Sequence, residues 1–314
     1  TGDHLLTAKA IAKQIGLQGN DSSNGDLIAA SGRELEKMND SKLAEIADRA
    51  AVFARVAPEQ KLRLVKALQS RGHVVAMTGD GVNDAPALKQ ADIGVAMGIT
   101  GTDVAKGAAD MLLTDDNFAS IEAAVEEGRG VFDNLTKFII WTIPTNAGEG
   151  LILLAAIFLG TALPAVPVQL LWINLSTAIF LGLFLVFEPK EKDLMDRPPR
   201  DPKTPILTFP LFMRTGLVTL MLLAGAFGLF LWERQHGASL EEARTIVVNT
   251  VVFVELFYLL NCRSLTHSVR EIGWLSNPLM LAGIAAMIGA QLLFTYTPVM
   301  NKLFHSAPIG FDSW

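Results

Sequence analysis

Five long apolar segments in the second half of the chain limit what it can fold into. From about Phe138 onward, apolar runs alternate with short polar stretches, whereas residues 1–130 carry frequent charged side chains. Each run approaches the roughly 20 residues that a helix needs to cross a bilayer. We therefore predict a soluble part followed by five membrane helices, at 131–159, 168–187, 209–232, 245–262 and 275–296.

The positions of Lys and Arg predict an orientation. Basic residues are abundant in the loops after the second and fourth spans, absent from 160–167, and sparse between the third and fourth spans. Since Lys and Arg accumulate on the cytoplasmic side, the soluble part and the 188–208 loop should be cytoplasmic. Residues 297–314 should then lie outside the cytoplasm and lead to a missing last helix. We expect a multi-pass protein of the plasma membrane.

The first 120 residues alternate between helix-like and strand-like patterns. This alternation predicts a parallel sheet covered by helices, an α/β doubly wound domain. We expect helices at 4–15, 58–70 and 85–90, and strands at 51–56, 73–78, 92–97 and 111–114.

The segment TGDGVNDAP, residues 78–86, follows a predicted strand and precedes a helix that starts near Asn83. Ligands bind at this edge of a parallel sheet. Asp80 and Asp84 should face a common point, and the two glycines let the backbone approach closely. A pair of carboxylates beside a helix start suits Mg²⁺ together with a phosphate. The alternative is a turn with capping aspartates.

Two further segments could contact a phosphate. Thr1 and Gly2 precede a helix, so a hydroxyl and main-chain N–H groups could hold phosphate oxygens, although a helix cap is an equal alternative. Lys61 lies on the first turn of the helix at 58–70 and could neutralise a transferring phosphoryl group. By itself this lysine would be read as a solvated surface side chain.

Polar residues inside the apolar spans are candidates for an ion path, because they are costly in a bilayer. Asn146 and Glu149 share one face of the first span, just after Pro144, which breaks the main-chain hydrogen-bond ladder. Other spans contribute Asn174, Ser176, Thr177, Asn249 and Glu255. Hydrogen bonding between helices is the alternative, chiefly for Ser176 and Asn249. We expect Glu188 to cap its helix or to pair with Lys190.

Charge and cysteine content exclude other classes. The net charge is −6 and no basic patch is present, so nucleic acid is not an expected partner. The single cysteine, Cys262, cannot form an internal disulfide.

These segments resemble the haloacid-dehalogenase-like phosphorylation domain of P-type cation-transporting ATPases. The resemblance continues through residues 124–138, 167–175 and 195–205 and is closest to the calcium-pump-like branch. It implies an α/β Rossmannoid phosphorylation domain at 1–120, an α-helical transmembrane domain at 121–296, and an Mg²⁺-dependent pump that phosphorylates an aspartate from ATP. The implied roles are Mg²⁺ binding by Asp80, support of phosphate and metal by Asn83 and Asp84, and phosphoryl contacts from Lys61, Thr1 and Gly2.

The resemblance also implies an ion site. Ion ligands of the calcium-pump branch match Asn146, Glu149, Asn174, Thr177 and Glu255. The family usually has an aspartate after the threonine of the second span, where this chain has Ala178. The loss of that carboxylate favours a single ion, or a different one such as Na⁺ or H⁺.

Several segments that are typical of the family are absent from this sequence. It has no Asp-Lys-Thr-Gly-Thr segment, no ATP-binding domain and no first four membrane helices. We expect this fragment alone to be inactive, and its partners to be the missing amino-terminal part, membrane lipid and the transported cation. A membrane-anchored phosphatase is rejected, since no suitable nucleophilic aspartate precedes Lys61. A catalytically inactive regulatory or interaction fragment stays open.

Overall fold

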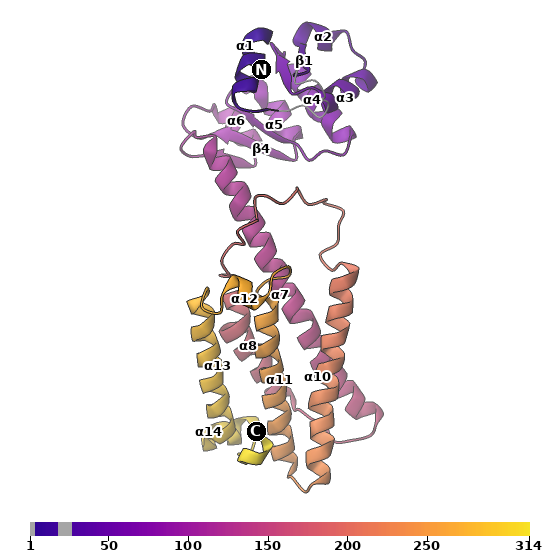
Figure 1. The fold of residues 1–314 in the computed structure, drawn as a ribbon, viewed down its shortest axis with the longest axis vertical. Coiled ribbons are helices and arrows are strands. Elements are labelled where there is room, and N and C mark those ends of the chain that lie inside the picture. The colour runs from indigo at the N-terminus through magenta and orange to yellow at the C-terminus, as the bar shows by residue number, and fades with distance from the viewer. Residues whose placement is uncertain (1–3, 18–26) are drawn as a thin grey trace. The chain divides into compact units, whose positions relative to one another are not determined.

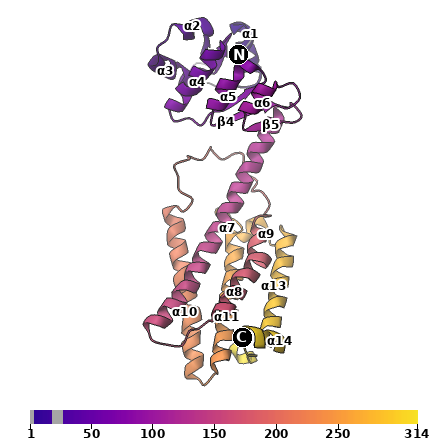
Figure 2. The ribbon, with the colours of Figure 1, turned by 180° about the vertical axis from the view of Figure 1, so that it is seen from behind.

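The computed structural model describes residues 4–17 and 27–314, which divide into two compact units after Ala124 (Figures 1 and 2). The first unit contains helices α1 (Leu5–Gln14), α2 (Gly32–Glu36), α3 (Asp40–Arg49), α4 (Pro58–Ser70), α5 (Ala85–Gln90) and α6 (Asp103–Ala108), and strands β1 (Ala29–Ser31), β2 (Val52–Ala54), β3 (Ala76–Gly79), β4 (Ile93–Met97) and β5 (Met111–Leu113).

All strand pairs in the first unit are parallel, so the predicted α/β class is confirmed. The described strands form two groups, β1–β2 and β3–β4–β5, rather than the single sheet that we expected. Helix α4 packs against both groups. Its adjacent residues Leu64 and Val65 belong to different apolar clusters, one with Ala30 of β1 and the other with Val75 and Ala87.

The second unit is helical. It comprises α7 (Ala119–Phe158) from Val125 onward, α8 (Pro167–Thr177), the π-helical turn η2 (Ala178–Gly182), α9 (Leu183–Leu185), α10 (Phe209–Gln235), α11 (Leu240–Cys262), α12 (Val269–Ile272), α13 (Pro278–Tyr296) and α14 (Pro298–Phe304). By length and composition, five of the described helical segments can cross a membrane: α7, the run Pro167–Val186, α10, α11 and α13. Helix α7 begins at Ala119, because an amphipathic helical stretch at 121–138 precedes the apolar run that predicted the membrane span from 131.

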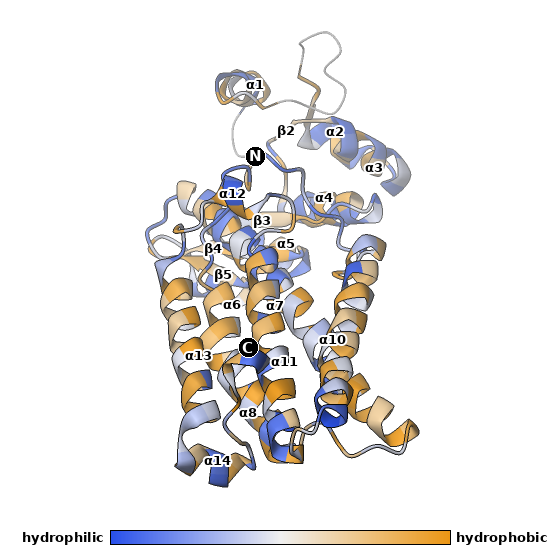
Figure 3. Ribbon diagram, turned by 60° about the horizontal axis from the view of Figure 1, so that its bottom comes forward, coloured by the Kyte–Doolittle hydropathy of each residue, from blue (hydrophilic) through white to orange (hydrophobic). Residues whose placement is uncertain are grey.

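Helix α11 is the central element of this unit. Its most apolar window is 67% buried, whereas the corresponding windows of the other four segments are 33–39% buried. Figures 1 and 2 show it beside α10 and α8, and apolar residues follow the lengths of these helices in Figure 3. Large apolar side chains such as Phe158, Leu217 and Met221 are exposed on the outer helices. Exposed apolar side chains on long helices suit contact with lipid.

Candidate functional site

The loop after β3 brings Lys61 and Asp84 together. The Lys61 Nζ lies 2.5 Å from Oδ1 of Asp84, and the Gly81 N–H donates to Oδ2 at 3.3 Å. Asp84 is buried at the end of a short 3₁₀ turn, η1 (Val82–Asp84). A side chain on Gly79 would place its Cβ only 2.6 Å from the Asp84 Cβ. Glycine is therefore required where β3 ends, because any Cβ would displace the aspartate.

The start of α4 positions Lys61. Pro58 occupies the first turn, where its missing N–H costs nothing. The Gln60 side chain accepts a hydrogen bond from the Ala57 N–H at 2.9 Å and donates to the Gly32 carbonyl at 2.9 Å. These contacts tie the helix start to the end of β1 and direct Lys61 toward the β3 loop.

Asp80 and Asn83 lie in the same loop with exposed side chains. The main-chain carbonyl of Asp80 accepts a hydrogen bond from the Thr102 N–H at 2.8 Å, which holds the loop against the start of α6. The Asp80 carboxylate thus stands at the carboxyl end of a parallel strand, next to the ion pair between the half-buried Lys61 and the buried Asp84. Hard carboxylate oxygens in this position fit Mg²⁺. Thr1 and Gly2 lie outside the described residues.

Three aspartates, Asp92, Asp110 and Asp116, accept main-chain hydrogen bonds that were not predicted from the sequence. Asp92 accepts a hydrogen bond from the Val75 N–H, and Asp110 accepts one from the Gly94 N–H, both at 2.8 Å. Asp116 accepts from the Ile99 and Thr100 N–H groups, and the bond from Ile99 is the largest cause that lowers its pKa to about 2. Each carboxylate accepts an N–H within three residues of the start or end of a strand. The signal in the sequence was an aspartate beside each short strand or helix, a pattern also typical of ordinary turns.

Inside the helical unit, four of the predicted ion-site residues meet. The Asn174 amide donates to Oε2 of Glu149 at 2.7 Å, between α8 and α7. The Glu255 carboxyl of α11 is close enough to the Glu149 carboxyl and the Thr177 hydroxyl for an electrostatic interaction, while the Thr177 hydroxyl itself donates to the Ile173 carbonyl at 2.9 Å. Both glutamates are buried. Three helices therefore supply oxygen atoms to one location.

The two carboxyl groups are not fully satisfied by the described part of the chain. One oxygen of Glu149, Oε1, and one of Glu255, Oε2, are buried without a hydrogen-bond partner there. Two neighbouring buried carboxylates repel each other and are costly in an apolar region. A cation or a shared proton would offset this cost, so the donor set fits a hard cation.

The remaining predicted position, Asn146, is exposed on α7. Among the described residues, no side-chain hydrogen bond joins it to the four residues above. Asn174 and Ala178 are exposed as well, and Ala178 begins the π-helical turn η2 directly after Thr177. π turns are rare and often mark functional sites, and this one was not predicted from the sequence.

Ser176 and Asn249 make hydrogen bonds within and between helices, which was the alternative to a role in the ion path. The Ser176 hydroxyl donates to the Trp172 carbonyl of its own helix. The Asn249 carbonyl oxygen accepts from the Gln291 side chain at 3.0 Å, and Gln291 in turn accepts from the Trp172 indole at 3.1 Å. This network joins α11, α13 and α8 with its polar groups paired. Gln291 was not predicted from the sequence.

Neither alternative for Glu188, a helix cap or a pair with Lys190, is found among the contacts of the described residues. Glu188 is buried, 2.7 Å from the Arg263 guanidinium, and accepts from the Asn277 amide at 2.8 Å. Lys190 instead lies 2.5 Å from Glu127 of α7. A buried carboxylate requires a partner that is buried too, and Arg263 meets that condition, whereas Lys190 does not.

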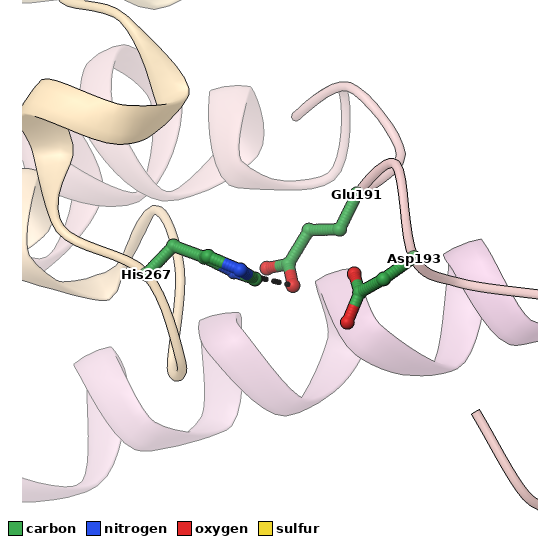
Figure 4. Close-up of side chains that lie close together, drawn as sticks. All are labelled: Glu191, Asp193 and His267. Atoms are coloured by element: carbon green, nitrogen blue, oxygen red, sulfur yellow. Dashed lines mark ion pairs between the residues drawn. The ribbon is translucent and has the colours of Figure 1, made fainter. Parts of the chain in front are cut away.

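Figure 4 shows a second cluster, formed by Glu191, Asp193 and His267, whose nearest ligand atoms all lie within 4.8 Å of one another. The Arg197 guanidinium donates to both carboxylates, and Lys137 lies 3.5 Å from Glu191. Protein cations thus already neutralise these acids. The arrangement is an ion-pair network that holds the chain after α9 against α7, and we assign no metal to it.

Sequence models of known families match both units. The model described as "Cation transporting ATPase, C-terminus" covers residues 162–314. Two models of haloacid dehalogenase-like hydrolases cover residues 1–92 and 61–125.

Curated relatives align with the whole chain. The chain is 60% identical over 315 residues to the "Probable cation-transporting ATPase F" of Mycobacterium tuberculosis. It is 46% identical over 322 residues to the "Cation-transporting ATPase pma1" of Synechocystis and 40% identical over 315 residues to the "Calcium-transporting ATPase" of Bacillus subtilis. Each alignment includes 100% of this chain and 35% of the relative, so the chain spans about a third of the length of these proteins.

Proposed function

This chain belongs to the P-type cation-transporting ATPases, and we propose that it supplies part of the phosphorylation machinery and part of the ion path of an ATP-driven cation pump. The observation that carries this proposal is the pair of buried glutamates, Glu149 and Glu255, in a group of long apolar helices. Each has one carboxyl oxygen that finds no hydrogen-bond partner among the described residues. A structural role alone would not require two uncompensated carboxyl groups there.

The β3 loop is proposed to serve phosphoryl transfer. Asp80, with an exposed carboxylate, would hold Mg²⁺, which supplies charge neutralisation at the phosphoryl oxygens when bound. Asp84 orients Lys61 through their 2.5 Å contact and retains lone pairs for a metal-bound water. Lys61 would neutralise the phosphoryl group and Asn83 would donate to it, together with Thr1 and Gly2. The phosphorylated aspartate and the ATP-binding residues would come from the amino-terminal part of the pump.

The transported ion is proposed to lie between α7, α8 and α11, with ligands from Glu149, Asn174, Thr177 and Glu255. Asn146 and Asn174 have exposed side chains, which suits completion of the site by helices of the amino-terminal part. Two carboxylates balance one divalent cation, and Ala178 adds no third charge. A single Ca²⁺ therefore fits best, and Na⁺ or H⁺ are the alternatives.

This arrangement implies a membrane protein with the phosphorylation unit in the cytoplasm, and we place it in the plasma membrane. The fragment by itself should neither hydrolyse ATP nor transport an ion, because its sequence lacks the Asp-Lys-Thr-Gly-Thr segment.

The test is Glu149→Gln in the complete pump. Phosphoenzyme formation from ATP is measured against Ca²⁺, Na⁺ and pH. We expect the apparent affinity for the stimulating cation to fall by more than about tenfold, because the neutral amide no longer offsets the ion's charge. Glu241→Gln, at an exposed glutamate on the first turn of α11, is the matched control and should behave as the parent. Unchanged ion dependence in Glu149→Gln would contradict the proposed site.

A further inference from the structure

A gap in the main-chain hydrogen-bond ladder of α7 lies close to the proposed cation site. Pro144 has no N–H, so the Ile140 carbonyl, four residues earlier, loses its usual helical donor. Ile140 is fully buried. A buried carbonyl without a donor is costly in an apolar environment, and neighbouring helices must then supply a substitute.

Helix α11 supplies that substitute. The Tyr258 hydroxyl donates to the Ile140 carbonyl at 3.2 Å, and the tyrosine is buried. Its ring is in turn covered by the Arg214 guanidinium, 5.3 Å from the ring centroid, which limits its freedom to turn away.

Two more bonds between helices hold the same part of α7. The Trp141 indole donates to the main-chain carbonyl of Glu255 at 3.0 Å, and the Thr219 hydroxyl of α10 donates to the Pro144 carbonyl at 3.1 Å. All four of these residues are buried. The proline segment is thus attached to α11 and α10 within a few residues of Glu149.

The same turn of α11 carries both the donor and the second carboxylate. Glu255 and Tyr258 are three residues apart and lie on one side of the helix. A change in the contact between Tyr258 and Ile140 would therefore move α7 relative to the Glu255 carboxyl. This movement of α7 would extend five residues beyond Pro144 and would shift Glu149.

We propose that the Tyr258 hydroxyl replaces the main-chain donor that Pro144 removes, and thereby positions the Glu149 carboxyl against Glu255. Tyr258 is a positioning residue, since it acts through α7 rather than on the ion. Its effect on transport rests on the proposed cation site, whereas its compensation for Pro144 does not.

The test is a cycle of four complete pumps: the parent, Tyr258→Phe, Pro144→Ala, and the double variant. Phosphoenzyme formation is titrated with Ca²⁺, or with Na⁺ if Na⁺ rather than Ca²⁺ stimulates the parent. Tyr258→Phe should lower the apparent ion affinity roughly 3- to 15-fold at an unchanged maximal level. In the double variant the main-chain N–H restored by the alanine satisfies the Ile140 carbonyl, so affinity should return to within about twofold of Pro144→Ala alone.

A matched control uses the other tyrosine of the chain. Tyr296 donates to the Ile309 carbonyl at 3.0 Å, between α13 and the carboxyl-terminal segment. Tyr296→Phe removes the same atom from a tyrosine that does not contact α7 through its hydroxyl, and it should leave the apparent ion affinity at the parent's value.

Thermal unfolding of the same four proteins in detergent provides a second measurement that does not depend on transport. The decrease in Tm caused by Tyr258→Phe should be largely absent in the Pro144→Ala background. An equal decrease in both backgrounds, or parent-like ion affinity in Tyr258→Phe, overturns the inference. If Glu149→Gln leaves ion dependence intact, the cation site is wrong, and the Tm cycle alone then decides whether Tyr258 compensates for Pro144.

Discussion

At the scale of single residues, two neighbouring carboxylates of the first unit, those of Asp80 and Asp84, differ in how deeply they are buried. Asp84 is buried and neutralised by Lys61, so it belongs to the framework of the loop. Asp80, four residues earlier, is exposed. The same residue type thus has two physical states within one short loop, and only the exposed one is immediately accessible to a metal ion.

Asp80→Asn should raise the Mg²⁺ concentration needed for phosphoenzyme formation in the complete pump by more than about tenfold, because a neutral amide is a much weaker ligand for a hard cation. The measurement is a Mg²⁺ titration at fixed ATP. Glu36→Gln, an exposed carboxylate on α2, is the control. The proposed metal ligand would be refuted by equal Mg²⁺ requirements in parent and Asp80→Asn.

Asp116 should make the loop at Ile99 and Thr100 sensitive to acid. Its hydrogen bonds, that from Ile99 first, lower its pKa from the ordinary 3.8 to about 2. A depressed carboxyl pKa stabilises the fold above about pH 4, and this stabilisation is lost as the pH falls toward about 2. Asp116→Asn should remove most of that pH dependence.

The readout is hydrogen exchange at the Ile99 and Thr100 amides, corrected for intrinsic rates, between about pH 5 and pH 2.5. Protection in the parent should fall across this range, whereas Asp116→Asn should be poorly protected throughout. Asp103→Asn, at an exposed position on α6, should resemble the parent. A parent whose protection does not change with pH would exclude the role of Asp116.

At the scale of elements, close packing between α7 and α10 depends on one glycine. A Cβ on Gly148 would lie 2.3 Å from the Leu222 Cδ2, and Leu222 is fully buried. Gly150, two residues later on the same helix, has open space around it. The two glycines therefore have the same helical backbone conformation but differ in the space available for a side chain.

Gly148→Ala should destabilise the helical unit by about 1–3 kcal/mol through overpacking, even though alanine favours the helix. Gly150→Ala should be neutral or stabilising. Thermal unfolding in detergent measures both, and Leu222→Ala should relieve part of the effect of Gly148→Ala. If the two glycine variants had the same Tm, the close approach would not limit packing.

At the scale of the whole molecule, the distribution of Lys and Arg predicts which side of the membrane each loop occupies. Cysteine labelling can test this, because the single native cysteine, Cys262, is buried. Met195→Cys should react with an impermeant maleimide from the cytoplasmic side. Gln235→Cys, at the end of α10, should react from the opposite side. Reaction of both from the same side, or the reverse pattern, would show that the orientation is wrong.

Local sequence patterns were sufficient for much of the fold. Apolar runs located the membrane helices, and Pro58 and Gly72 bounded a helix that the structure places at Pro58–Ser70. The strand–loop–helix motif at 78–86 likewise placed Asp80 and Asp84 beside the end of β3. These features depend on a few consecutive residues, whose backbone preferences and hydropathy act over short distances.

Contacts between distant residues could not be obtained this way. The partner of Glu188 is Arg263 rather than Lys190, the strands form two groups instead of one, and the donor for Ile140 is the hydroxyl of Tyr258. Each of these depends on which segments, distant in the sequence, come together in three dimensions. Periodicity identifies the buried face of a helix but not the residue opposite it, so the pairing of buried polar groups emerges only when the helices pack.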